Sequence, residues 1–231
     1  MNPTPWWRPA LDVLLPPLCQ GCDRPLTRED WTLCGPCLNA LTPPPEGCLR
    51  CGEGPAEGIC PLCLDNPPPW DRLRSGVSYD EVAQQLVHAF KYGDRPRVAE
   101  RLGEWMATWP RPEVDVIHAV PLHRDRLRSR GYNQAQWLAR PLARGYKLPL
   151  EDLLERGRTS VSQASQAGSR RMENVADSYR LTGGKVEGRR VLLVDDVFTT
   201  GATSRACALR LKEAGAEWVE VWTFARARVG K

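Results

Sequence analysis

The sequence lacks a hydrophobic segment long enough to cross a membrane. A spanning helix needs about 20 consecutive apolar residues, whereas the N-terminal stretch W-W-R-P-A-L-D-V-L-L-P-P is shorter and is interrupted by prolines. The same stretch does not have the form of a secretory signal peptide. We therefore expect a short amphipathic N-terminal helix that packs on the protein, no membrane span, and a location in the cytoplasm.

Two common nucleotide-binding fingerprints are also absent. No glycine is followed by Lys in the G-x-x-x-x-G-K-[ST] form of a P-loop, and no G-x-G-x-x-G follows a strand as in a Rossmann fold. A phospho-receiver domain is excluded as well, because the acidic pair Asp195 and Asp196 is too close to the C-terminus for the rest of that fold to follow. Any phosphate site in this chain must therefore use a different motif.

Composition is ordinary overall, but charge is uneven along the chain. With 231 residues, of which 42% are hydrophobic and 26% charged, the chain can bury a sizeable core in one or two domains. Residues 1–70 carry four basic and eight acidic side chains, a net charge of −4, whereas the remainder carries 28 basic and 20 acidic, a net charge of +8. We expect the C-terminal part to bind anions. A soluble surface that is merely rich in arginine is the alternative.

Eight of the nine cysteines form four C-x-x-C pairs near the N-terminus. The pairs are Cys19/Cys22, Cys34/Cys37, Cys48/Cys51 and Cys60/Cys63. One such turn points two thiolates at a metal, and two turns complete a tetrahedral zinc site. We expect two structural zinc ions, with sequential pairing as the simplest arrangement and interleaved pairing as the alternative. Disulfides are the rival interpretation, which a reducing cytoplasm disfavours.

Three consecutive prolines mark the end of the cysteine-rich segment. A proline run stiffens a connection and cannot continue a helix. We expect an N-terminal helix and a double zinc ribbon over residues 1–66, a linker over 67–70, and a second domain over 71–231. The ninth cysteine, Cys207, is expected to be a small core residue.

The second domain alternates short apolar runs with helical patterns. Apolar and β-branched runs predict strands over residues 73–79, 114–120, 191–194 and 217–224. Helical spacing predicts helices over residues 81–92 and 98–109, from 133, and from 203 to a stop at 215. This alternation predicts an α/β fold with a parallel sheet of about five strands flanked by helices.

Residues 191–204, V-L-L-V-D-D-V-F-T-T-G-A-T-S, carry the clearest chemical signal. An apolar strand leads into two carboxylates, Asp195 and Asp196, then hydroxyls and a glycine before a helix. Hydroxyls and N–H groups at a helix N-terminus bind anions, and carboxylates accept hydrogen bonds from a diol. A ribose 5-phosphate offers both groups. An ordinary strand, turn and helix is the alternative.

These residues closely resemble the phosphoribosyl pyrophosphate (PRPP) loop of type I phosphoribosyltransferases. In that family the paired acids hold the ribose 2- and 3-hydroxyls, a role that the resemblance gives to Asp195 and Asp196. The 5-phosphate is held by the loop that follows, which here comprises Thr199, Thr200, Gly201, Ala202 and Thr203.

A second stretch, P-L-H-R-D-R-L-R-S-R-G-Y-N-Q-A, places four arginines between a predicted strand and a predicted helix. Loops at the carboxyl edge of a parallel sheet bind ligands in open α/β folds, and arginine grips pyrophosphate bidentately. We expect Arg126 and Arg130 to approach the pyrophosphate. A solvated surface or a nucleic-acid stripe is the alternative. Residues 158–174 are small and polar, which predicts a mobile lid that delivers Arg171 or a loop without function.

The whole pattern narrows the resemblance to the ComF/GntX family. Its parts are the four C-x-x-C pairs, Lys91-Tyr92, the R-G-Y-N-Q of residues 130–134, Gln163 with Arg171 and Asn174, and the PRPP loop. This chain has R-G-Y-N-Q where R-G-F-N-Q is the commoner sequence in the family. The resemblance covers nearly the whole chain and implies a phosphoribosyltransferase fold and a link with competence, the uptake of single-stranded DNA in natural transformation. An acceptor substrate is not part of the motif.

Two functions compete on this basis. The first is a magnesium-dependent, PRPP-binding phosphoribosyltransferase in which charge stabilisation of the leaving pyrophosphate replaces a general base. The second is a single-stranded-DNA-binding competence factor, working with other competence proteins, whose PRPP loop serves nucleotide sensing or DNA phosphates. The basic C-terminal part and nine tryptophans permit base stacking on a cationic groove, although many of these tryptophans are expected in the core.

Overall fold

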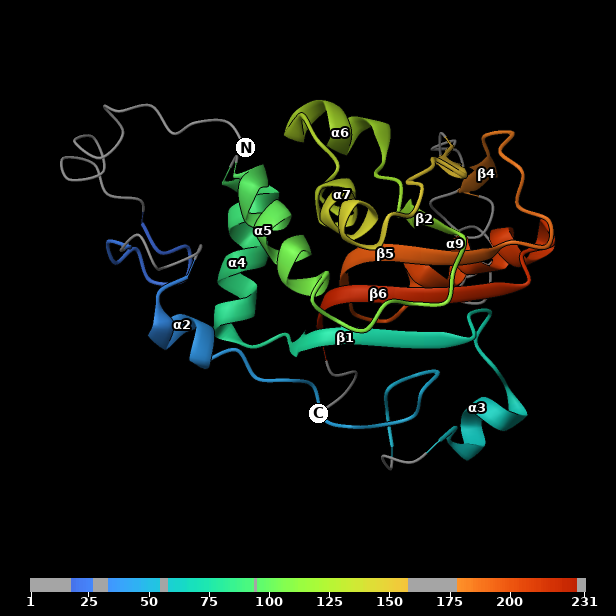
Figure 1. The fold of residues 1–231 in the computed structure, drawn as a ribbon, viewed down its shortest axis with the longest axis horizontal. Helices are drawn as coiled ribbons and strands as arrows, with labels where there is room; N and C mark the ends of the chain where they lie inside the picture. Colours follow the sequence, from blue (N-terminus) through green and yellow to red (C-terminus); the bar gives the residue numbers. More distant parts are fainter. Residues whose placement is uncertain (1–17, 27–32, 55–57, 94, 158–177, 228–231) are drawn as a thin grey trace, which may run out of the picture.

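A four-stranded parallel sheet forms the centre of the molecule (Figure 1). The computed structural model describes residues 18–26, 33–54, 58–93, 95–157 and 178–227. The strands lie in the order β1-β6-β5-β2, and all neighbouring pairs are parallel. Their bounds are β1 Arg72–Ser78, β2 Val116–Ala119, β5 Arg190–Phe198 and β6 Trp218–Arg226. The predicted α/β fold is confirmed, with four strands in the described part of this sheet where about five were expected.

The central strand β5 is apolar because both of its faces are covered. Residues 191–194 have exposed fractions of 0%. The strand continues through the two aspartates to Phe198, beyond the predicted end, and pairs Asp195 with Thr223 of β6. Tertiary pairing thus outweighs the low strand preference of aspartate. The acids therefore lie on the strand itself, at its carboxyl end.

Helices cover both faces of the sheet. The helices α5 (Pro96–Met106) and α7 (Gln134–Tyr146) pack together on one face, with α4 (Glu81–Tyr92) beside α5. The helix α9 (Ala202–Glu213) lies across the other face (Figure 1). Three of the four predicted helices begin within one residue of the expected position. The exception, α5, begins two residues early, because Pro96 suits the first turn of a helix.

One predicted loop is a helix. Residues Arg124–Arg130, expected as a loop, form α6. The side chain of His123 begins the helix by accepting a hydrogen bond from the N–H of Asp125, and Gly131 ends it at a φ of +81°. No residue of α6 is buried, so the sequence shows no apolar periodicity that would reveal the helix. A short antiparallel pair, β3 (Leu154–Arg156) with β4 (Tyr179–Leu181), was also not predicted.

The cysteine-rich segment runs along the free edge of β1. The N–H of Ser78 donates to the carbonyl of Thr42 at 2.7 Å, and the N–H of Leu73 donates to the carbonyl of Leu49 at 2.9 Å. Two short helices of this segment lie on different sides of the molecule (Figure 1): α2 (Gly35–Asn39) and α3 (Pro61–Asp65). The domain boundaries at residues 66 and 71 stay a prediction, and the expected N-terminal helix lies outside the described residues.

The core lies between the sheet and the helices that cover it. Cys207 of α9 has an exposed fraction of 0%, which confirms its expected place in the core. Six tryptophans are buried in the core or packed against it: Trp70, Trp105, Trp109, Trp137, Trp218 and Trp222. Among the described residues, no helix has both the length and the apolar character needed to cross a bilayer.

Candidate functional site

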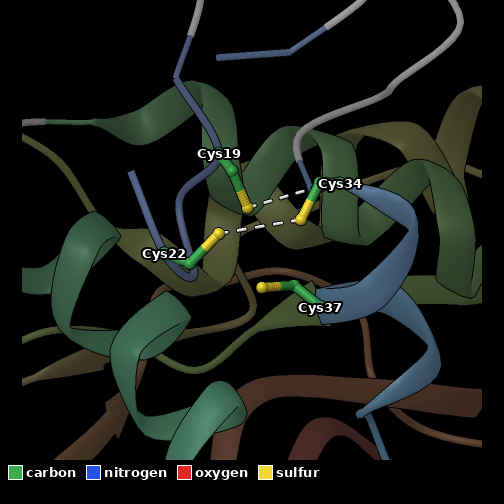
Figure 2. Close-up of side chains that lie close together, drawn as sticks. All are labelled: Cys19, Cys22, Cys34 and Cys37. Carbon is green, nitrogen blue, oxygen red and sulfur yellow. Dashed lines mark hydrogen bonds between the residues drawn. The ribbon is translucent and has the colours of Figure 1, made fainter. Parts of the chain in front are cut away.

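The first four cysteines point at one another (Figure 2). The Sγ atoms of Cys19, Cys22, Cys34 and Cys37 all lie within 4.8 Å of one another. Those of Cys22 and Cys34 are 3.7 Å apart. A tetrahedral zinc ion with Zn–S distances of about 2.3 Å requires sulfurs about 3.8 Å apart. The four thiols therefore fit one zinc ion.

The second cluster repeats this geometry with the remaining pairs. The Sγ atoms of Cys48, Cys51, Cys60 and Cys63 also lie within 4.8 Å of one another, and those of Cys51 and Cys60 are 3.7 Å apart. Sequential pairing of the C-x-x-C turns is thus confirmed. Four thiolates fill every position of a tetrahedral ion, so both sites suit structural zinc and leave no position for a substrate.

Backbone N–H groups converge on one sulfur in each cluster. The Sγ of Cys19 accepts hydrogen bonds from the N–H of Gly21 at 3.4 Å and of Cys34 at 3.3 Å. Burial opposes ionisation of this thiol, but these hydrogen bonds and the neighbouring thiols lower the pKa of Cys19 to about 7. Cys48 has the same arrangement, and against the effect of burial its pKa is lowered to about 6. Zinc binds thiolates, so Cys19 and Cys48 favour the form that the metal needs. Burial and the neighbouring thiols act in the opposite direction on Cys37 and Cys63, whose pKa is raised.

The carboxyl end of β5 carries a closely packed acidic pair. Asp196 has an exposed fraction of 4%, and its Oδ1 lies 2.8 Å from Nζ of Lys91. Its other oxygen, Oδ2, is buried and has no hydrogen-bond partner among the described residues. Asp195 is partly buried, and its Oδ1 accepts a hydrogen bond from the N–H of Asp196 at 2.8 Å. Asp196 Oδ2 is therefore an acceptor that a ligand hydroxyl would satisfy.

The environment of Asp195 favours its protonated form. Burial and the neighbouring charge of Asp196 raise the pKa of Asp195 from 3.8 to about 7. The N–H of Asp196 and the ammonium of Lys91 act in the opposite direction but do not cancel the effect. Asp195 therefore changes charge near neutral pH. The binding of a ligand hydroxyl or of a metal ion to this carboxylate would depend on pH in the same range.

The loop after β5 turns the chain into α9. Thr199, Thr200 and Ala202 are exposed, whereas Gly201 is buried with a φ of +72°. The hydroxyl of Thr200 accepts from the N–H of Ala202 at 3.4 Å, and Gly201, the N-cap residue of α9, has no side chain to cap the helix. The N–H groups of this turn, with the exposed hydroxyls, form the kind of terminus that binds a phosphate. Thr203, at the second position of α9, is partly exposed.

A cationic cavity of about 640 Å³ adjoins the acidic pair. It is lined by residues from α4, α6 and the turn after α6: Lys91, Tyr92, Arg126, Arg128, Ser129, Arg130, Gly131 and Tyr132. Arg130 lies over the ring of Tyr92 at 5.4 Å and donates to Oε1 of Gln134 at 2.6 Å, whereas Arg126 is exposed. The structure thus brings the two predicted arginines together. Arg171 and the predicted lid lie outside the described residues.

Lys91 connects this cavity with the acidic pair. It lines the cavity and also contacts Asp196. Lys91 belongs to the pattern shared with the ComF/GntX family, but no role for it follows from the sequence alone, because its partner is far away in the chain. Only the folded structure, which brings the last turn of α4 to the carboxyl end of β5, reveals the contact.

Known proteins resemble this chain over most of its length. The model of the phosphoribosyl transferase domain matches residues 128–231. DNA utilization protein YhgH of Escherichia coli (strain K12) is 31% identical over 231 residues, covering 93% of this chain and 99% of that protein. Competence protein F of Haemophilus influenzae is 29% identical over 221 residues, covering 91% and 90% of the two chains.

Among solved structures, the glutamine PRPP amidotransferase from B. subtilis complexed with ADP and GMP is similar in 59% of this chain and 30% of its own, with 27% identity and a TM-score of 0.45. The similarity to YhgH, by contrast, extends over both chains almost completely. Together with the matched domain and the two cysteine clusters, it shows that this chain belongs to the ComF/GntX family of proteins with a phosphoribosyl transferase domain.

Proposed function

We propose that this protein binds PRPP at the carboxyl end of β5 and transfers its phosphoribosyl group. The observation that carries the proposal is the carboxylate of Asp196, which is 4% exposed and has an unpartnered oxygen among the described residues. Leaving a buried acceptor unpaired costs about 1–3 kcal/mol. The ribose 2- and 3-hydroxyls would supply donors to Asp196 and to Asp195 beside it, at the sheet edge where open α/β folds bind ligands.

The 5-phosphate, in this proposal, lies in the loop Thr199–Thr203. Its oxygens would accept from the hydroxyls of the threonines and from the N–H groups at the start of α9. Gly201 allows the tight turn of this loop, because its φ is in the left-handed region of backbone angles, which residues with a side chain disfavour. Ala202 adds a backbone donor without bulk.

The pyrophosphate would lie in the cationic cavity beside Lys91. Arg126 and Arg130 line this cavity, and their guanidinium groups can stabilise the charge that develops as the bond to C1 of the ribose breaks. Asp195 and Asp196 offer the oxygen ligands that Mg²⁺ prefers, and a magnesium ion bound with the donor would offset part of the pyrophosphate charge. We assign no general base, because charge stabilisation suffices for a dissociative transition state.

The biological setting follows from the relatives. One is named for DNA utilization and another for competence. We propose that this protein acts in the cytoplasm in DNA uptake during natural transformation, together with other competence proteins.

Ligand-induced stabilisation tests the proposal. At a ligand concentration about 100-fold above Kd, PRPP with magnesium should raise the melting temperature by roughly 5–10 °C. The double variant Asp195→Asn/Asp196→Asn keeps the side-chain shapes and should lose this shift. An equal shift in both proteins would contradict binding at the acidic pair.

A second candidate function, binding of single-stranded DNA, is favoured by a separate groove. A cavity of about 800 Å³ is lined by several arginines and tryptophans, among them Arg72, Arg74, Arg111, Arg190 and Trp218. Arg72 and Arg111 are exposed. Arg72, Arg190 and Trp218 begin their strands, whereas the PRPP loop follows the end of β5. Cationic grooves with aromatic groups suit a nucleic-acid strand.

Oligonucleotide binding distinguishes the two candidates. Salt-sensitive binding that is lost in Arg72→Glu/Arg111→Glu but kept in Asp195→Asn/Asp196→Asn would support the groove. Because the groove and the PRPP loop use different residues, both functions can hold at once. Binding that is independent of salt and of the groove arginines would contradict the second candidate.

A further inference from the structure

Trp70 is a buried residue that joins the second cysteine cluster to the body of the protein. Its exposed fraction is 4%. Its indole N–H donates a hydrogen bond of 2.6 Å to the carbonyl of Arg50. Arg50 lies between Cys48 and Cys51, inside the turn that presents two of the four sulfurs. The indole nitrogen of Trp70 is therefore fixed by the backbone of a metal-binding turn.

The ring of the same tryptophan packs against the PRPP loop. It meets the ring of Phe198 edge-on, with centroids 5.7 Å apart and an interplanar angle of 87°. A Cβ added at Gly201 would lie 3.3 Å from the Trp70 ring and 2.6 Å from the Phe198 ring. The guanidinium of Arg205, in the first turn of α9, lies 5.8 Å from the Trp70 ring. Trp70 thus contacts the segments before, within and after the loop.

A second connection runs from the same metal-binding turn to the neighbouring strand. Arg226, at the end of β6, is 8% exposed and donates to the carbonyl of Gly52 at 2.6 Å and to the carboxylate of Glu53. Arg226 is also the register partner of Phe198, and the N–H of Ala227 donates to the carbonyl of Phe198 at 2.8 Å. Residues 50–53 therefore contact the end of β6 directly and the end of β5 through Trp70.

The conformation of the loop depends on this packing. Gly201 has a φ of +72°, in a region that few residues favour, and its Cα side faces two aromatic rings with no room for a methyl group. A shift of the Arg50 carbonyl would move the indole of Trp70, and this indole packs against the loop at Gly201. The first cysteine cluster contacts other parts of the body: Gln20 accepts a hydrogen bond from Arg95, near α5, and the buried cysteines of this cluster pack in the main core.

We propose that Trp70 is a positioning residue that makes the shape of the PRPP loop depend on the second zinc centre. Zinc in the cluster Cys48, Cys51, Cys60 and Cys63 holds the turn, the turn holds the indole, and the indole holds the backbone of residues 199–203. The phosphate-binding part of the inference rests on the proposed function, whereas the coupling between metal and loop does not.

Amide hydrogen exchange measures the coupling without any ligand. In zinc-loaded full-length protein, Trp70→Phe keeps a ring against Phe198 but removes the hydrogen bond to Arg50. Exchange of residues 199–203 should rise about fivefold, while exchange of residues 191–194 in β5 should not change. Cys60→Ser, which removes one ligand of the second cluster, should also raise exchange of residues 199–203. In the double variant Trp70→Phe/Cys60→Ser, exchange of these residues should be little higher than in Trp70→Phe alone.

Two matched controls distinguish this coupling from a general destabilisation of the protein. Trp109→Phe makes the same chemical change at a tryptophan that packs on Trp105 and Trp222. Cys22→Ser removes a ligand of the first cluster. Both should leave exchange of residues 199–203 unchanged. The inference would be overturned by equal loop exchange in wild type and Trp70→Phe, or by equal effects of Cys22→Ser and Cys60→Ser.

Binding of PRPP with magnesium supplies the second measurement. If the wild type binds and the inference is correct, Trp70→Phe should weaken binding by about fivefold at unchanged zinc content, in line with the loss of one hydrogen bond. If the wild type does not bind, the proposed function fails, but the exchange data still decide the coupling. Wild-type affinity in Trp70→Phe, together with unchanged loop exchange, would overturn it.

Discussion

The ammonium of Lys91 lies 2.8 Å from Oδ1 of Asp196, which joins the last turn of α4 to the carboxyl end of β5. The carboxylate is 5% exposed in its side chain and the lysine 21%. The pair links the cavity that we assign to pyrophosphate with the acids that we assign to ribose. Its first consequence is for stability, because a buried charge needs a partner.

Replacing Lys91 by methionine should therefore destabilise the protein. The change leaves the buried carboxylate of Asp196 without a cation, which should cost about 1–3 kcal/mol in the free energy of unfolding, measured by urea denaturation. The matched control is Arg101→Met, which breaks the exposed ion pair with Glu104 and should cost less than about 1 kcal/mol. Adding Asp196→Asn to Lys91→Met should recover part of the loss. Equal costs for Lys91→Met and Arg101→Met would contradict the importance of the buried pair.

The raised pKa of Asp195 predicts a pH dependence with a definite sign. The folded protein keeps a proton on Asp195 up to about pH 7, whereas the unfolded chain loses it near 3.8. This group's contribution to stability is thus fully present below about pH 4 and is lost as the pH rises through about 7. The unfolding free energy of the wild type, relative to Asp195→Asn, should fall between about pH 4 and pH 7. A constant difference would show that the pKa of Asp195 is not raised.

The same ionisation should control ligand binding. If the ribose hydroxyls and magnesium need the carboxylate form of Asp195, PRPP affinity should increase as the pH rises through about 7. The phosphates of the ligand also titrate, so the comparison is with Asp195→Asn, whose residual binding reports the ligand's own contribution. Parallel pH profiles for the two proteins would remove Asp195 from the site.

Two glycines with nearly the same backbone angle separate conformational cost from packing cost. At Gly188, with a φ of +71°, an added methyl group would meet no other atom within 4 Å. At Gly201, with a φ of +72°, the methyl group would lie 2.6 Å from Phe198. Gly188→Ala should cost about 1 kcal/mol, and Gly201→Ala about 1–3 kcal/mol more, measured by thermal unfolding. Equal costs would mean that the loop is not packed against the rings.

Metal content tests the two cysteine clusters. Purified protein should contain close to two zinc ions per chain, and Cys22→Ser or Cys51→Ser should each remove one, because each cluster supplies four ligands to one ion. Elemental analysis measures both values. A content near zero in the wild type would contradict the assignment of zinc.

Local signals in the sequence were sufficient for the fold class and for most of the candidate site. The acids, the threonines and Gly201 lie in one continuous stretch, and each C-x-x-C turn is also local, so spacing alone indicates their chemistry. The predicted strands form because their apolar runs are buried on both faces, as at residues 191–194. The roles of the PRPP-loop residues and of the arginines stay predictions.

Contacts between distant segments could not be predicted. Lys91 and Asp196 meet only because the fold brings the end of α4 to the end of β5. Trp70, the last residue of the predicted linker, lies against Gly201 of the loop. The helix α6 has no buried residue and thus no apolar pattern. The strand β5 continues past its acids because β6 pairs with it, which the sequence of β5 does not reveal.

Isothermal titration of zinc-loaded protein with PRPP and magnesium tests the central claim most directly. The account predicts saturable heat with a stoichiometry near one, no such heat in Asp195→Asn/Asp196→Asn, and weak competition by inorganic phosphate, which lacks the diol. Absence of heat in the wild type would contradict a ribose site at Asp195 and Asp196. So would an affinity for inorganic phosphate, measured by its competition with PRPP, equal to the affinity for PRPP itself.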